Sequence, residues 1–206
     1  GESAATFRIH DPTEVARRLA RLASAREAFL AGADAVPIER HALLSDGRVM
    51  ALVSPGAKIS WMCAPRVDGP ALFAELLGGP AAGHFTVEPS QPDNNPQQQY
   101  DGASLVLKTT WPRLTVTDFL DCSAGKPTQR AGRTDLIRQI EGRGEVRITF
   151  APRLDFGRLP TRLVIRDGGL EIDDTIDPIV LRAPGVEWEL LEEGSHQTAV
   201  GTVTLR

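Results

Sequence analysis

The sequence predicts an all-β fold, an antiparallel β-sandwich with an amphipathic helix at its N-terminal end and one further short helix. After Pro37, short apolar segments alternate with the turn-favouring residues Gly, Pro and Asp. In Val146–Phe150 apolar and polar residues alternate strictly, so one face of that strand is buried and the other solvated. The long helical pattern of the chain lies before Pro37, which leaves the rest to strands.

The first 36 residues are expected to form a segment of their own. Thr6–Ile9 indicates a short strand, and Asp11 is a candidate N-cap with Pro12 at the first helical position. Apolar residues then recur at roughly helical spacing, at Val15, Leu19, Leu22, Phe29 and Leu30. We therefore divide the chain into a strand–helix segment, 1–36, and a β-sandwich domain, 37–206.

Twelve candidate strands follow in the second segment. They are Arg48–Ser54, Lys58–Cys63, His84–Glu88, Ser104–Trp111, Leu114–Leu120, Asp135–Glu141, Glu145–Ala151, Thr161–Arg166, Leu170–Asp173, Ile179–Arg182, Val186–Leu191 and Gln197–Arg206. Three connections carry turn residues and are expected to close hairpins, namely Trp111–Leu114, Gly142–Gly144 and Asp167–Gly169.

Three stretches depart from the strand pattern. Pro70–Leu77 is predicted to be a short helix, because a proline opens it and two glycines follow it. Ser90–Gln99 and Ser123–Arg133 are polar and contain proline or glycine, so we expect loops there.

Composition excludes several classes of function. The 206 residues carry a net charge of −4, and their 23 Lys and Arg are scattered, so a nucleic-acid interface is not expected. No apolar run reaches the roughly 20 residues that a membrane helix needs, so no membrane partner is expected. Two cysteines are too few for a disulfide scaffold, and a cytoplasmic location is the expectation.

Known catalytic motifs are absent from the sequence. It contains no Gly-rich phosphate loop, no His-Glu-x-x-His helix and no Gly-x-Ser-x-Gly elbow, and its four histidines lie far apart. We therefore expect no catalytic residue, no metal site and no cofactor. The acidic run Glu171–Asp177 is open to two interpretations, a cation site or a charged hairpin edge, and its spacing favours the edge because it matches no calcium loop.

The most specific stretch is Gly56–Leu77, where a strand containing Trp61 leads into a loop with Arg66 and Asp68. An aromatic ring can stack on the C–H face of a sugar while Arg and Asp bond its hydroxyls. The alternative, which we favour, is that Trp61 belongs to the core and Arg66 and Asp68 form an ion pair that fixes the loop.

Both cysteines, Cys63 and Cys122, are interpreted as small buried hydrophobic residues rather than nucleophiles, because no base is evident near either one in the sequence.

Short sequence motifs follow one another between residues 41 and 158. The motifs are His41–Arg48, Ala51–Val53, Ile59–Trp61, Pro65–Asp68, Phe73–Gly79, Gly83–Phe85, Val116–Leu120, Leu136–Gly142 and Pro152–Arg158. On these motifs the chain resembles the N-terminal β-sandwich domain of bacterial glycoside hydrolase family 15 proteins, which are glucoamylase-like and trehalase-like. The fold that this resemblance implies is a sandwich of the supersandwich type.

A second resemblance covers Ala4–Leu30, which looks like the last strand and helix of a trehalose-phosphatase domain. Segment 1–36 would then be the remnant of such a domain. The phosphatase nucleophile motif, Asp-x-Asp-x-Thr or Val, does not occur in the chain.

The first resemblance implies inverting hydrolysis of α-glucosidic bonds by two carboxylates on a helical toroid, which follows the sandwich. The expected function is therefore a non-catalytic accessory domain of a glucoamylase- or trehalase-like hydrolase in trehalose or α-glucan metabolism. Its expected partners are the missing C-terminal toroid and an α-glucoside ligand, and the fragment alone is expected to be inactive.

Two other functions stay open. One is a carbohydrate-binding module that uses the Trp61 loop together with Trp111, Trp188 and Tyr100. The other is part of a fusion with a trehalose-6-phosphate phosphatase.

Overall fold

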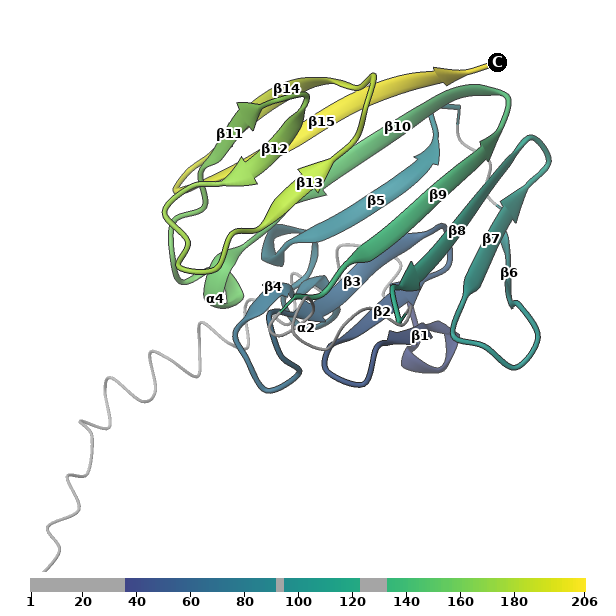
Figure 1. Ribbon diagram of the computed structural model, residues 1–206, viewed down its shortest axis with the longest axis horizontal. Coiled ribbons are helices and arrows are strands. Elements are labelled where there is room, and N and C mark those ends of the chain that lie inside the picture. The colour runs from purple at the N-terminus through teal and green to yellow at the C-terminus, as the bar shows by residue number, and fades with distance from the viewer. Residues whose placement is uncertain (1–35, 92–94, 123–132) are drawn as a thin grey trace, which may run out of the picture. The chain divides into compact units, whose positions relative to one another are not determined.

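The computed structural model describes residues 36–91, 95–122 and 133–206 (Figure 1). The strand and amphipathic helix predicted before residue 36 lie outside the described residues, as does nearly all of the loop predicted at Ser123–Arg133. Val36–Arg206 forms one compact unit by itself.

Three antiparallel sheets make up the described part of the chain. The large sheet has the order β1-β2-β3-β5-β10-β15-β14, with β4 paired to β3. Its strands are β1 (Ala42–Ser45), β2 (Met50–Ser54), β3 (Lys58–Cys63), β4 (Ala71–Phe73), β5 (His84–Pro89), β10 (Gly144–Ala151), β14 (Glu187–Glu193) and β15 (His196–Leu205).

The two smaller sheets lie in front of the large one in Figure 1. One contains β6 (Gln97–Tyr100), β7 (Leu107–Trp111), β8 (Leu114–Leu120) and β9 (Leu136–Gly142). The other contains β11 (Leu163–Arg166), β12 (Gly169–Ile172) and β13 (Val180–Arg182). The short helical turns are η1 (Ile38–Arg40), α2 (Glu75–Gly78), η2 (Pro80–Ala82) and α4 (Leu154–Gly157).

One hydrophobic core joins the three sheets. It draws Ile59 and Phe150 from the large sheet, Val116 from the four-stranded sheet and Leu170 from the three-stranded sheet. The prediction of a mostly β, antiparallel fold is confirmed, and each of the twelve candidate strands overlaps an observed strand. Strand β10 shows the predicted alternation, because Arg147 is exposed while its neighbours Val146 and Ile148 are buried.

Two of the three predicted hairpin turns are confirmed. Trp111 pairs with Leu114 across the β7–β8 turn, and Arg166 pairs with Gly169 across the β11–β12 turn. The third prediction is wrong, because Gly142–Gly144 carries the chain from β9 in the small sheet to β10 in the large one. At Gly142 the backbone has φ +140°, and a Cβ would lie 2.1 Å from the Arg113 carbonyl oxygen, so a glycine is required at this corner.

The predicted helix at Pro70–Leu77 is also corrected. Ala71–Phe73 forms β4, which pairs with β3, and α2 begins only at Glu75. All three residues of β4 are buried, so pairing and burial on β3 outweigh the local helical signal.

Two further strands were not predicted, β1 and β6. The loop expected at Ser90–Gln99 ends in β6, a polar strand at the edge of its sheet. The Gln98 side-chain amide donates to the Ser54 carbonyl (3.0 Å) and to Thr109 Oγ1 (3.1 Å), which holds this edge strand against the large sheet.

A buried ion pair connects the two layers. Asp118 on β8 and Arg138 on β9 are direct cross-strand partners, and their side chains are 0% and 5% exposed. Arg138 donates from Nε to Asp118 Oδ1 (2.8 Å) and from Nη2 to Oδ2 (3.1 Å). It also donates to the carbonyl oxygens of Phe85 (2.9 Å) and Ala57, and its guanidinium carbon lies 4.6 Å from the centre of the Phe85 ring. Arg138 therefore ties the four-stranded sheet to the main chain of the large sheet.

Removing Arg138 is expected to destabilise the domain strongly. In Arg138→Met the Asp118 carboxylate stays buried without its cation, a change that typically costs about 3–5 kcal/mol. Urea unfolding would measure this loss, with Arg143→Met, at an exposed position beside β9, as a control that changes the free energy of unfolding by less than about 0.5 kcal/mol. We expect the double variant Asp118→Asn/Arg138→Met to regain part of the loss. A single-variant loss as small as that of the control would contradict this account.

Candidate functional site

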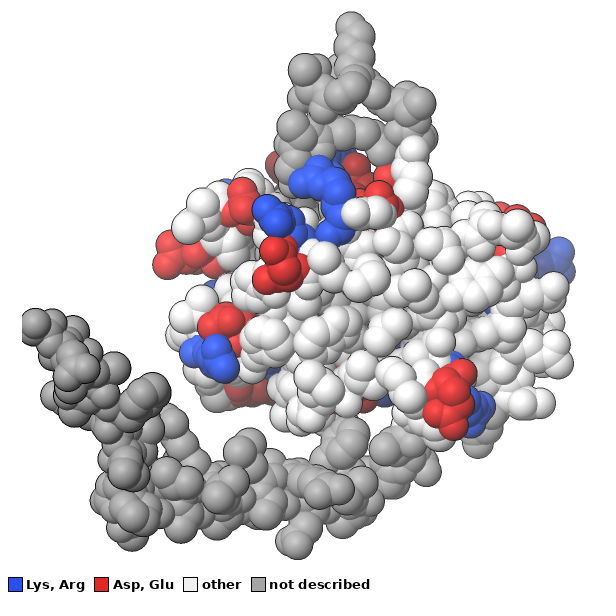
Figure 2. Space-filling model, turned by 90° about the horizontal axis from the view of Figure 1, so that it is seen from below, with Lys and Arg blue, Asp and Glu red and all other residues white. Residues whose placement is uncertain are grey.

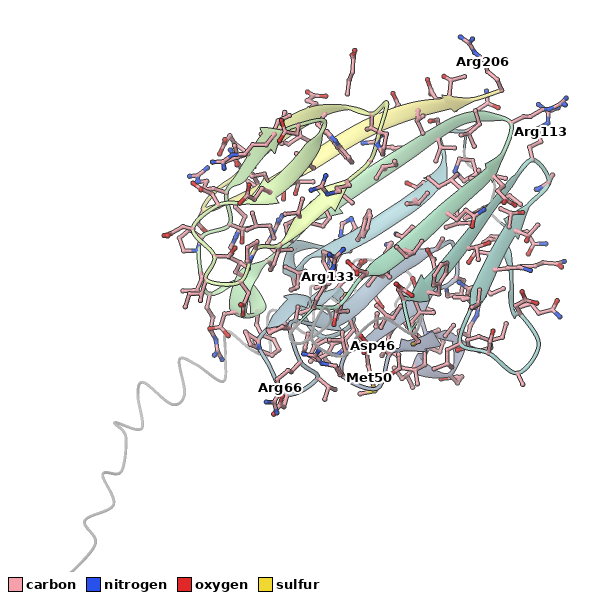
Figure 3. All side chains as sticks on the ribbon, viewed as in Figure 1. Asp46, Met50, Arg66, Arg113, Arg133 and Arg206 are labelled. Carbon is pink, nitrogen blue, oxygen red and sulfur yellow. The ribbon has the colours of Figure 1, made fainter. Side chains whose placement is uncertain are left out.

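Arg66 and Asp68 lie in the loop between β3 and β4 and pair with each other. Arg66 donates from Nε to Asp68 Oδ1 and from Nη2 to Oδ2, each at 3.0 Å. Both side chains are largely exposed, at 69% and 65%. The loop is held in place by the Val67 N–H, which donates to the Arg48 carbonyl (2.9 Å). Figure 3 shows Arg66 at the lower edge of the molecule, pointing away from it.

Trp61 occupies a different environment on β3. Its ring packs on Phe156 of α4, with ring centres 5.9 Å apart and planes inclined at 53°. It is also part of a small apolar cluster with Cys63, Ala71 and Ala74. Within the described residues, Arg66 and Asp68 therefore form an ion pair, whereas Trp61 packs against apolar neighbours.

The two cysteines differ from each other. Cys63 is buried, as predicted, and burial raises the pKa of its thiol. Cys122 is exposed, so the prediction that it is buried is wrong. It lies two residues after Leu120, the last residue of β8, and its Sγ lies 3.4 Å from the Leu120 carbonyl oxygen.

A polar cluster that sequence reasoning missed lies around Glu75. Lys58 Nζ is 3.0 Å from Glu75 Oε1, and His84 Nδ1 is 3.7 Å from Glu75 Oε2. Both Oε2 and Nδ1 are buried and lack a hydrogen-bond partner. The three residues are distant in sequence and meet because β3 pairs with β5, with Lys58 opposite Thr86. Sequence patterns alone do not indicate such a register.

The environment of His84 disfavours its charged form. Burial lowers the pKa of its imidazole below the ordinary value of 6.5, although the nearby Glu75 carboxylate acts in the opposite direction. The cluster therefore contains a Lys–Glu ion pair beside a histidine that is neutral at pH 7.

A second buried cation, Arg153, fastens the chain after β10 to the end of the large sheet. It is 2% exposed. Its guanidinium donates to the carbonyl oxygens of Pro152 (2.8 Å) and Gln197 (3.2 Å), to Thr198 Oγ1 (3.0 Å) and to Glu193. With all of these contacts made within the domain, the role of Arg153 is structural.

No catalytic arrangement emerges from the other side chains that the structure describes. In residues 36–91, 95–122 and 133–206, no three His, Cys, Asp or Glu side chains converge as metal ligands would. Glu171, from the acidic run, faces Arg166 across the β11–β12 hairpin at 3.4 Å. An open depression of about 730 Å³ lies near Arg113 and Arg143, at the end of the molecule away from Arg66 (Figure 3). No helix among the described residues is long and apolar enough to span a membrane.

The lowered pKa of His84 predicts a pH dependence of stability. His84 binds a proton more readily in the unfolded chain than in the folded protein. The free energy of unfolding therefore falls as the pH drops below about 6.5. We expect His84→Gln to flatten the fall in the urea midpoint between pH 7 and pH 5. His41→Gln, whose ring contacts the Pro37 carbonyl at an exposed position, is the control and should keep the wild-type slope. Equal slopes for His84→Gln and the wild type would refute this assignment.

Comparison with known proteins places the chain in a family. Residues 24–206 match the family model described as trehalase-like, N-terminal. The chain is 30% identical over 142 residues to a trehalase of Mycobacterium tuberculosis, and 29% identical over 142 residues to a trehalase of Mycolicibacterium smegmatis. Each alignment covers 60% of this chain and 21% of the relative, so the match spans about a fifth of the curated relatives' length.

No solved structure shows a significant match to the chain. The family model, however, covers most of the sequence, including all three sheets of the described fold. The chain therefore belongs to the family of trehalase-like N-terminal domains.

Proposed function

We propose that this chain is the non-catalytic N-terminal domain of a trehalase-like glycoside hydrolase that acts on an α-glucoside such as trehalose. The family match over residues 24–206 carries the proposal. In the two trehalases that it resembles, about four-fifths of the polypeptide lies outside the matching region. We assign the catalytic groups and the substrate site to that remaining part.

Three carboxylates of the described fold are each engaged by a cation. Hydrolysis of a glycosidic bond requires two carboxyl groups, one on each side of the bond. Asp118 is buried against Arg138, Asp68 is engaged by Arg66, and Glu75 is paired with Lys58. Each of these carboxylates is neutralised by its own cation and so is poorly suited to act as a catalytic acid or base.

The aromatic residues give little support to a sugar-binding module. Trp111 is 5% exposed, and Trp188 packs against the main core. The Tyr100 hydroxyl is occupied by the main chain of Leu43, and Trp61 packs on Phe156. The rings of Trp111 and Trp188 and the Tyr100 hydroxyl are thus engaged within the described fold, which leaves the half-buried Trp61 as the one of these four residues that could stack on a sugar ring. The matches also give no support to a relation with trehalose phosphatases, so we do not propose one.

The purified chain is expected to release no glucose from trehalose or maltotriose. A coupled glucose assay measures this, with the full-length polypeptide that carries the sequence as the positive control. Glucose release by the chain alone, scaling with its concentration, would contradict the proposal.

Titration with trehalose and maltotriose tests the sugar-binding alternative. Because Trp111 is buried, Trp188 packs against the core and Trp61 packs on Phe156, we expect tryptophan fluorescence to stay unchanged at millimolar sugar. A saturable change that disappears in Trp61→Ala would establish sugar binding instead.

A further inference from the structure

An apolar row crosses the outer face of the first three strands. Leu43 on β1 is the direct partner of Leu52 on β2, and Leu52 is the direct partner of Trp61 on β3. Their sequence neighbours Leu44, Ala51 and Met62 lie in the core. Since successive side chains of a strand point to opposite faces, the row points away from the core.

Two more side chains extend this row. Met50 lies two residues before Leu52 on β2 and is 40% exposed. Phe156 packs on Trp61 and is 42% exposed. We call these five residues, Leu43, Met50, Leu52, Trp61 and Phe156, the apolar row.

Further exposed apolar side chains lie near the apolar row. Figure 2 shows the molecule from below, the side on which β1, β2 and α2 lie in Figure 1. A broad part of this face has no charged side chain, and its acidic and basic residues gather toward the margins. Ile38, Val67 and Leu77, in segments next to these strands, are also 47–68% exposed. Soluble monomers rarely leave a large contiguous apolar surface open to water, so such a face indicates a binding surface.

Other exposed parts of the large sheet have a different character. On the edge strand β14, Glu187 and Glu189 are exposed. Charged residues there oppose pairing with another chain. The apolar row on β1–β3 therefore differs from the acidic edge at the opposite end of the same sheet.

The edge strand β1 is closed to strand addition at its centre. The Tyr100 hydroxyl accepts a hydrogen bond from the Leu43 N–H (2.6 Å) and donates one to the Leu43 carbonyl (3.0 Å). A partner on this side of the domain must therefore be recognised through the side chains of the apolar row, because the main-chain groups of Leu43 are already used.

We propose that the apolar row forms the docking surface for the catalytic part of the trehalase-like polypeptide. This inference rests on the proposed function. The occupant follows from the relatives, in which about four-fifths of the length lies outside the matching region and is covalently joined to it. The partner surface must itself be apolar and uncharged, since the row offers neither charges nor free main-chain groups.

Methionine oxidation tests this docking directly, because the chain has two methionines in opposite environments. Met50 is 40% exposed and Met62 is 6% exposed. Peroxide oxidation of each is followed by mass spectrometry in the 206-residue chain and in the full-length polypeptide. We expect Met50 to be oxidised several-fold more slowly in the full-length polypeptide, and Met62 to be slow in both. Equal rates for Met50 in the two proteins would overturn the proposal.

Charge variants provide a second readout. Met50→Lys places a cation in the docking surface, whereas Val180→Lys places one on β13, at a position that is 49% exposed outside it. We expect Met50→Lys to lower the melting temperature of the full-length polypeptide while leaving that of the isolated chain unchanged, and Val180→Lys to change neither. Equal effects of the two variants would count against the docking surface.

Two outcomes separate this inference from its alternatives. If Met50 is already protected in the isolated chain and sedimentation shows a dimer, the occupant is a second copy and the inference is overturned. The oxidation experiment needs no enzymatic activity. A full-length polypeptide that protects Met50 but releases no glucose from α-glucosides therefore supports the docking surface while refuting the proposed function.

Discussion

A single buried ion pair, Arg138 with Asp118, sets how the two layers of strands meet. Burial of apolar surface holds the sheets together but is not directional. The Arg138 guanidinium, in contrast, forms hydrogen bonds to particular atoms of both layers. It bonds the Asp118 carboxylate on β8, the Phe85 carbonyl oxygen on β5 and the Ala57 carbonyl oxygen in the β2–β3 turn, and it also lies over the Phe85 ring. The four-stranded sheet is thereby fixed to β5 and to the β2–β3 turn of the large sheet.

The other buried charges act in the same way at other corners of the fold. Arg153 fastens the chain after β10 to β14 and β15, and Lys58 with Glu75 joins β3 to α2. Asp118, Arg138 and Arg153 all fall within the motifs on which the family resemblance rests. The resemblance therefore follows the polar contacts that hold the scaffold together, which explains why it identifies the fold without revealing any catalytic group.

Sequence patterns predicted the parts of the fold that depend on local order. Alternation along β8 and β10 is visible in the sequence, and both strands were placed nearly to the residue. Strand β4 was predicted as a helix because a proline opens the segment and two glycines follow it. Its three residues are all buried and show no alternation that would mark a strand. The corner at Gly142 was predicted as a hairpin, since turn residues do not reveal which sheet the next strand joins.

The features of the candidate site also differ in whether local sequence could predict them. Arg66 and Asp68 are two residues apart, and their ion pair was foreseeable from that spacing. The His84–Glu75 cluster and the apolar row arise from strand register, since Leu43, Leu52 and Trp61 become neighbours only once β1, β2 and β3 have paired. Register depends on burial over the whole sheet, so neither feature has a local signature.

These features together describe a scaffold whose buried cations are paired within the domain and whose outer face carries an apolar row, as a domain that serves a larger enzyme would have. The mass of the native polypeptide tests this claim most directly, and an immunoblot of the source cells with an antibody against the domain measures it. Our account predicts a band far above the 22.3 kDa of this chain, because the catalytic part is joined to it. A native band at 22.3 kDa would contradict the account, since the domain would then exist without an enzyme to serve.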